Sequence, residues 1–313
     1  MTNNKVKKTA LDRKLDKIRA AEESGKLGTK LTNRTLRKLT SNKLAVFGVI
    51  LFVIICLLCF GAPLFTEFSP TAFDLRAKMS PPDMKHIMGT DQMGRDIWAR
   101  MLYGGRISII VGLGSALGAA AVGVTLGLYV GYKGGILDNL LIKISDIFQS
   151  IPQMVLIIII VALVGQSMEN LIIIFILTGW PGMYRMARSK VLSLKQQEFV
   201  QALRAFGISD VKIAFKHLLP NTLGPVVVNI TLSTAMFILQ EASLSVLGYG
   251  VPMEIATWGN IINVITNGGT IRFDWLQYWW MWLPCAIMLI LFVLSINFIG
   301  DGLRDASDPT QIG

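Results

Sequence analysis

The sequence predicts an all-α, polytopic integral membrane protein with six transmembrane helices. Three observations predict this fold class. Of the 313 residues, 52% are hydrophobic and only 16% are charged, whereas about a quarter of the residues of a soluble domain are charged. The mean hydropathy is +0.54. The apolar residues lie in long runs, and most basic residues lie between those runs.

The basic residues are concentrated near the amino terminus, and this position predicts the orientation. Thirteen of the 30 Lys and Arg residues precede residue 44, together with four acidic residues. Cytoplasmic segments beside a membrane span carry such an excess of positive charge, so we expect residues 1–43 to be cytoplasmic. The same distribution argues against nucleic acid as a partner. We expect no cleavable signal peptide, because the first apolar run is too long.

The first transmembrane helix is expected over residues 44–66. This run is almost wholly apolar, and about 20 residues suffice to cross the hydrocarbon core. Residues 67–100 are polar with balanced charges, which suits an extracytoplasmic loop. Cys56 and Cys59 lie inside the apolar run without a second ligand pair. We therefore interpret them, like Cys285, as buried helix cysteines and not as a metal or redox site.

Five further spans are expected within residues 101–300, and they place the tail, residues 301–313, in the cytoplasm. In the second span, two sets of glycines are each spaced four residues apart, which lets another helix backbone approach closely. The outer end of the last span carries three tryptophans, which is typical of a membrane interface. The spans are expected at residues 107–131, 138–164, 171–187, 221–247 and 280–299. The glycines are Gly114, Gly118, Gly123, Gly127 and Gly131, and the tryptophans are Trp279, Trp280 and Trp282.

The basic loop between the fourth and fifth spans, within residues 190–220, predicts two short helices. Gly207 is expected to end the first helix. Ser209 or Asp210 is expected to cap the second, and Pro220 is expected to stand where the fifth span begins.

An apolar ridge follows the first of these two helices. Phe199, Leu203 and Phe206 recur at i, i+4 and i+7, which places them on one face. Such a ridge, flanked by basic residues, suits a groove in another protein. It also suits lipid headgroups, and the residues alone leave both partners open.

The same loop resembles the EAA loop of ABC importer permeases, whose pattern is E-A-A, three residues, Gly, nine residues and I-x-L-P. At the full spacing, this chain has Gln201-Ala202-Leu203, Gly207 and His217-Leu218-Leu219-Pro220. Gln201 replaces the acidic residue, so the resemblance implies the docking geometry without a carboxylate there. In the family this segment is the coupling helix that fits a groove of the ATPase subunit. The resemblance assigns the coupling role to Phe199, Gln201, Ala202, Leu203, Phe206, Gly207, Asp210, His217, Leu219 and Pro220.

Other segments are similar to the second permease subunit of dipeptide, oligopeptide and nickel importers. This resemblance runs from about residue 40 to the carboxyl terminus. It implies the type I ABC importer permease fold and a translocation path for di- or oligopeptides, formed with a second permease. It also implies two ATPase subunits, an extracytoplasmic solute-binding protein and a location in the cell membrane. The matching segments are His86 to Asp96 with Arg100, Gly104, Arg106 and Ser108, Asp146 with Pro152, Glu241 to Gly248, and Gly300 to Asp305.

Polar residues near or within the spans are candidates for function, because charged groups in lipid are costly. Asp146 either lines the path or pairs with Lys143 or with headgroups. Gln240 and Glu241 either line the path or brace the loop that begins at Gly248. His217 is expected to make a hydrogen bond at a helix end and not to act as a proton switch.

The segment 86–96 carries one histidine and two aspartates, but their spacing matches neither a zinc site nor an EF-hand. Thr90 or Asp91 is instead expected to cap the helix that leads into the second span. We therefore expect no metal site there.

No G-x-x-x-x-G-K-[ST] phosphate loop occurs in the sequence. We expect the chain to have no catalytic site and no cofactor of its own, with ATP and Mg²⁺ used by partner ATPases. Three alternatives remain: a permease for nickel or another small solute, a secondary transporter or channel, and a membrane-anchored scaffold. A secondary transporter would show inverted repeats with broken helices, and a channel would show a polar filter.

Overall fold

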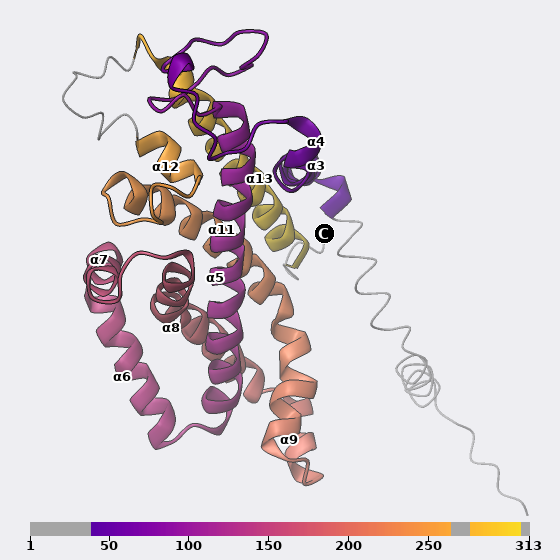
Figure 1. Ribbon diagram of the computed structural model, residues 1–313. Coiled ribbons are helices and arrows are strands. Elements are labelled where there is room, and N and C mark those ends of the chain that lie inside the picture. Colours follow the sequence, from indigo (N-terminus) through magenta and orange to yellow (C-terminus); the bar gives the residue numbers. More distant parts are fainter. Residues whose placement is uncertain (1–38, 264–275, 308–313) are drawn as a thin grey trace, which may run out of the picture.

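The computed structural model describes residues 39–263 and 276–307, and within these ranges every regular element is a helix. Most of the predicted basic segment 1–43, part of the last outer loop and the end of the tail lie outside the described residues. Figure 1 shows a bundle with the segment before α5 and α12 (Trp258–Ile262) at one end and α9 (Glu198–Ala205) at the other.

The prediction of six spans is not confirmed. Four helices of the described residues are long and apolar enough to cross a membrane, and a bent pair gives up to five. The predicted fourth span is α8 (Met168–Lys195), which is not among them. Its apolar run is short and ends at Leu177, after which small and polar residues follow. The four are α3 (Lys43–Phe60), α5 (Ile97–Lys133), the continuous helix Asp210–Val246 and α13 (Leu283–Ser307).

The predicted third span, 138–164, is two helices and not one. Helix α6 (Ile136–Ser150) meets α7 (Gln153–Val164) at an angle of 91°. Pro152 lacks an amide hydrogen and disfavours the helical region for the residue before it. Ile151 is accordingly extended, with φ −97° and ψ 133°. The proline therefore accounts for the break.

Helices α5 and α8 pack closely because two glycines of α5 face the α8 backbone. A Cβ atom at Gly123 would lie 2.5 Å from the carbonyl oxygen of Trp180, and one at Gly127 would lie 2.7 Å from that of Tyr184. Gly114, in contrast, has nothing within 4 Å of a built Cβ. The prediction that these glycines permit close backbone approach is confirmed for Gly123 and Gly127 and is wrong for Gly114.

Helix α3 lies against α13, where a Cβ at Gly48 would meet the Ser295 carbonyl oxygen at 2.8 Å. Asn42 caps α3 by accepting hydrogen bonds from two backbone amides. Cys59 is fully buried, as the sequence predicted, whereas Cys56 is only half-buried. Helix α13 continues to Ser307, so the expected boundary at residue 301 between the last span and the tail falls inside a helix.

Helix α12 fills the end of the bundle opposite α9. The Trp258 side chain is fully buried and donates from Nε1 to the Met101 carbonyl oxygen at 3.1 Å. A Cβ at Gly105 would lie 2.7 Å from its ring, so the glycine makes room for the indole. This contact joins α5 to the segment that follows α11 (Leu219–Val246).

Candidate functional site

The predicted loop forms α9 and a tight turn at the end of the molecule opposite α12 (Figure 1). Gly207 adopts φ +71°. Its amide donates to the Arg204 carbonyl at 2.9 Å, and the Ile208 amide donates to the Leu203 carbonyl at 3.2 Å. These two bonds form a Schellman motif, which places glycine in the left-handed position. Gly207 ends the helix, as predicted.

The predicted apolar ridge is only partly at the surface. Phe206 is 84% exposed and Phe199 is 40% exposed. Leu203 instead packs, partly buried, against the core, and Val200 is fully buried. The exposed apolar surface of α9 therefore consists of two phenylalanines, and the other side of the helix anchors it to the bundle.

The second half of the loop differs from the prediction. Ser209 occupies the position before α10 (Asp210–Lys212), but neither Ser209 nor Asp210 makes a capping hydrogen bond through its side chain within the described residues. A π-helical segment, η2 (Ile213–Leu218), then leads directly into α11. The helix is thus continuous from Asp210, although Pro220 lies in the first turn of α11 as expected.

The π-helical segment is satisfied by side chains that follow Pro220. Asn221 donates from Nδ2 to the His217 carbonyl oxygen at 2.7 Å. Thr222 donates to the Leu219 carbonyl oxygen at 2.8 Å. Pro220 has no amide hydrogen, and these two side chains add hydrogen bonds to backbone carbonyls close to it. His217 takes part in a helix hydrogen bond through its carbonyl. Elsewhere in the loop, Gln201 donates to the Gln196 carbonyl oxygen at 3.3 Å.

Two cations attach α9 and α8 to the end of α5. Lys195 donates to the Tyr132 carbonyl oxygen at 2.7 Å, and its Nζ lies 5.4 Å from the Tyr132 ring. The Arg204 guanidinium lies 5.2 Å from the same ring. Tyr132 is fully buried, and cations this close to an aromatic face are attracted to it. These contacts hold α9, with its exposed phenylalanines, against the end of α5.

An ion pair holds the start of α6 against α8. The Arg188 guanidinium donates to both carboxylate oxygens of Asp138 at 2.7 Å, and Tyr184 donates to the same group at 2.8 Å. Sequence reasoning missed Asp138 and Tyr132. The only signal for them was the abundance of basic residues in the loop, which left their partners unspecified.

Two of the three polar candidates in the spans, Asp146 and Gln240, join neighbouring helices. Asp146 pairs with Arg185 of α8 and not with Lys143. Gln240 donates from Nε2 to Gln153 Oε1 at 3.1 Å, which joins α11 to the start of α7.

Glu241 is fully buried in α11 and accepts hydrogen bonds from two serines. Ser108 of α5 donates to it at 3.2 Å and Ser245 donates at 3.1 Å. Ser108 in turn accepts from the Trp258 amide at 3.2 Å. These contacts join α5, α11 and α12, while the choice between a path and a bracing role for Glu241 stays a prediction.

The helix cap before α5 is a correction to the sequence prediction. Asp96, and not Thr90 or Asp91, accepts from the Ala99 amide at 2.7 Å and caps the helix. His86 Nδ1 lies 2.9 Å from the other Asp96 oxygen. Asp91 is unavailable because Arg95 and Arg100 flank its carboxylate.

The segment before α5 also contains an acidic turn. The backbone amides of His86 and Lys85 donate to Asp83 and hold the pKa of its carboxyl below the ordinary value. A lowered pKa stabilises the turn at neutral pH, and this contribution is lost as the pH falls.

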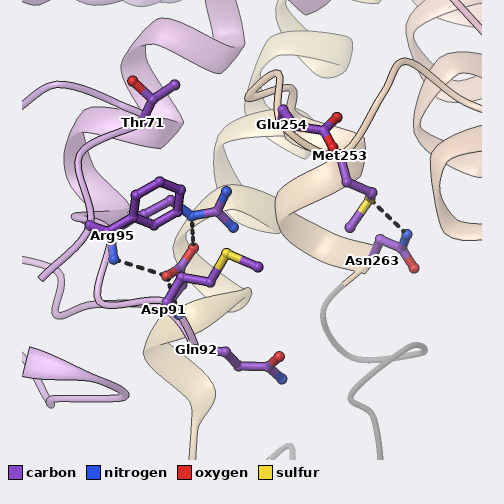
Figure 2. A pocket seen from close by; sticks show the side chains of 9 residues that line it. Thr71, Asp91, Gln92, Arg95, Met253, Glu254 and Asn263 are labelled. Atoms are coloured by element: carbon purple, nitrogen blue, oxygen red, sulfur yellow. Dashed lines mark hydrogen bonds and ion pairs between the residues drawn. The ribbon is translucent and has the colours of Figure 1, made fainter. Parts of the chain in front are cut away.

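A cavity of about 410 Å³ opens beside this cap (Figure 2). The Asp91 carboxylate projects toward Arg95, whose Nε lies 2.6 Å from it. Met253 lies across the cavity, and the Asn263 amide donates to its sulfur at 3.5 Å. The cavity combines thioether and aromatic groups with an already paired charge.

Two family models match this chain. Residues 123–312 match the model of the binding-protein-dependent transport system inner membrane component. Residues 30–82 match the N-terminal transmembrane domain of oligopeptide transport permease C. The chain is 35% identical to the oligopeptide transport system permease protein OppC of Bacillus subtilis, over 92% of this chain and 93% of that protein.

Two further proteins extend the comparison. The dipeptide transport system permease protein DppC of Alkalihalophilus pseudofirmus is 38% identical, over 87% of this chain and 88% of that protein. An inward-facing structure of the MetNI methionine ABC transporter has a TM-score of 0.52 at 23% identity, covering 66% of this chain and 96% of that one. The latter likeness concerns the fold alone. The chain is therefore a multi-pass membrane protein that belongs to the binding-protein-dependent transport system inner membrane components, the permease subunits of ABC importers.

Proposed function

We propose that this chain is a permease subunit of an ATP-driven importer of di- or oligopeptides. It forms the translocation path with a second permease and receives its substrate from an extracytoplasmic solute-binding protein. Two ATPase subunits bind ATP and Mg²⁺, and the chain itself catalyses no reaction and holds no cofactor. It lies in the cell membrane with both termini in the cytoplasm. Its similarity to oligopeptide and dipeptide permeases over most of its length supports this substrate class.

The exposed Phe206 at the tip of α9 carries the coupling part of the proposal. A phenylalanine that is 84% exposed at a helix end is costly in water and suits an apolar groove. The helix behind it is held by buried Val200 and by the Arg204 contact with Tyr132. A rigid base of this kind transmits the movement of a bound ATPase to α5 and α8.

The experiment is co-purification of the tagged chain with its ATPases, together with peptide uptake in proteoliposomes. Phe206→Asp and Gly207→Val are expected to reduce both ATPase association and uptake. Phe73→Asp is the matched control, because Phe73 is 65% exposed at the opposite end of the molecule. If both loop variants retain ATPase association and transport, the coupling role of α9 is wrong. Uptake of labelled nickel in place of labelled oligopeptides would overturn the substrate class.

A further inference from the structure

Helix α6 exposes two chemically different faces. Asn139, Lys143, Asp146 and Ser150 recur at i, i+4, i+7 and i+11, and all four are exposed. We call these four residues the polar face of α6. Beside it, a second exposed face is apolar and consists of Ile136 (87% exposed), Leu140 (51%) and Ile147 (61%). The two faces differ in polarity, and α6 and α7 together are apolar enough to form a span.

The cost of charge in a bilayer decides which environment each face takes. A charged side chain at the centre of a membrane is costly even on the most lenient scales. Lys143 and Asp146 are both exposed, and the Asp146–Arg185 pair leaves the Asp146 side chain 57% exposed. The apolar face therefore meets lipid, and the polar face meets water or polar groups.

The polar face leads to the break between α6 and α7. Figure 1 shows α6 rising from the end that carries α9, with α7 lying across its upper end. The amides of Gln153, Met154 and Val155 have no hydrogen-bond acceptor among the described residues. Gln240 donates from Nε2 to the Gln153 side chain, and its Oε1 atom is buried and likewise has no partner there. Backbone polar groups without partners do not occur against lipid, but they are tolerated where a segment lines a water-filled cavity.

We propose that the polar face of α6 and the break at Ile151–Pro152 line a water-filled path through which the transported peptide passes. This inference rests on the proposed function, since it takes the peptide as the substrate. The wall combines acceptor and donor side chains of both signs with free backbone amides at the break. Such groups match the amide and carbonyl groups of any peptide main chain, and they demand no particular side chain of the substrate.

The test measures how fast a charged, membrane-impermeant methanethiosulfonate modifies single cysteines in the assembled importer. Cys59 and Cys285 are fully buried, so only Cys56→Ala is needed to make the parent unreactive. Asn139→Cys and Lys143→Cys report on the polar face. Leu140→Cys and Ile147→Cys are matched controls, since they are exposed on the same helix.

The polar-face variants are expected to react at least about tenfold faster than the controls, because each unit by which lipid raises a thiol pKa removes about tenfold of the reactive thiolate. A transported oligopeptide in excess is expected to slow their modification and to leave the controls unchanged. Equal rates on the two faces would overturn the inference. Formation of disulfides between the Asn139→Cys variant and cysteines of the second permease, without modification by the reagent, would also overturn it and assign the face to that subunit.

Measurements on the same importer, reconstituted in proteoliposomes, distinguish a failure of this inference from a failure of the proposed function. ATPase association and peptide uptake are measured on the parent carrying only Cys56→Ala. If the parent transports peptide and the polar face does not react, the path inference fails while the function stands. If the parent takes up no peptide, the proposed function fails, whatever the reactivity of α6.

Discussion

At the scale of single residues, two aspartates of α6 pair with arginines of α8 at different depths. In the Asp138–Arg188 pair the side chains are 7% and 24% exposed, whereas in the Asp146–Arg185 pair they are 57% and 41% exposed. A buried pair that loses one partner leaves a desolvated charge behind. An exposed pair is screened and contributes little.

We therefore expect Asp138→Ala to destabilise the protein by about 3 kcal/mol, because Arg188 and Tyr184 both lose their acceptor. Asp146→Ala serves as the matched control and is expected to cost less than about 1 kcal/mol. Unfolding of the purified variants in detergent micelles measures both. Equal losses for the two variants would contradict the role of burial in this argument.

The sequence alone predicted best those residues whose backbone conformation depends only on their neighbours in the chain. Gly207 ends α9 because only a left-handed residue closes that turn, and the sequence alone indicates this. The cap of α5 could not be chosen in the same way, since three capping residues stand within the same short segment. Asp96 is the cap because the arginines around Asp91 occupy the competing carboxylate. That choice depends on tertiary contacts.

At the scale of elements, the glycines of α5 determine how close α8 lies. Gly127→Leu is expected to destabilise the protein by about 1–3 kcal/mol, because its Cβ would overlap the Tyr184 carbonyl oxygen. Gly114→Leu is expected to change stability by no more than about 0.5 kcal/mol, since nothing lies near that position. Thermal unfolding of both variants checks the pair. A larger loss at Gly114 would show that the α5–α8 contact is misassigned.

The break between α6 and α7 is the second testable feature at this scale. Pro152→Ala restores an amide hydrogen and frees Ile151 to become helical, so we expect the two helices to straighten. Spin labels at Leu140 and Leu163, both exposed, measure the change. In one straight helix they would be about 35 Å apart, and the 91° bend brings them closer.

Ser150→Ala is the control for this measurement, because it alters a neighbouring exposed side chain and keeps the proline. The label distance should lengthen in Pro152→Ala alone. An unchanged distance in Pro152→Ala would mean that packing against α11, including the Gln153–Gln240 bond, sets the bend.

The sequence predicted the positions of most helices, because long apolar runs and the helix period are local properties. It joined α6 and α7 into one span, since Pro152 is compatible with either a kink or a break. It also started the fifth span at Pro220, whereas the π-helical segment before that residue lets the helix continue from Asp210. Both differences concern how consecutive helices connect, which depends on neighbouring elements.

At the scale of the whole molecule, the segment before α5 lies with α12 at one end and the α9 tip lies at the other (Figure 1). Contacts link the α9 end to the start of α6. Arg204 contacts Tyr132 at the end of α5, and Asp138 at the start of α6 is held by Arg188. Helix α8, which also places Lys195 against Tyr132, therefore lies between α9 and the start of α6 in this set of contacts.

The central claim is that α9 binds an ATPase subunit and not the lipid surface. The most direct measurement is photo-cross-linking from a benzophenone amino acid at Phe206 in the assembled complex, with the same group at Phe73 as the control. We expect the Phe206 position to capture an ATPase subunit in high yield and the Phe73 position to capture none. Adducts at Phe206 that contain lipid alone, in a complex whose ATPases are present and active, would contradict the account.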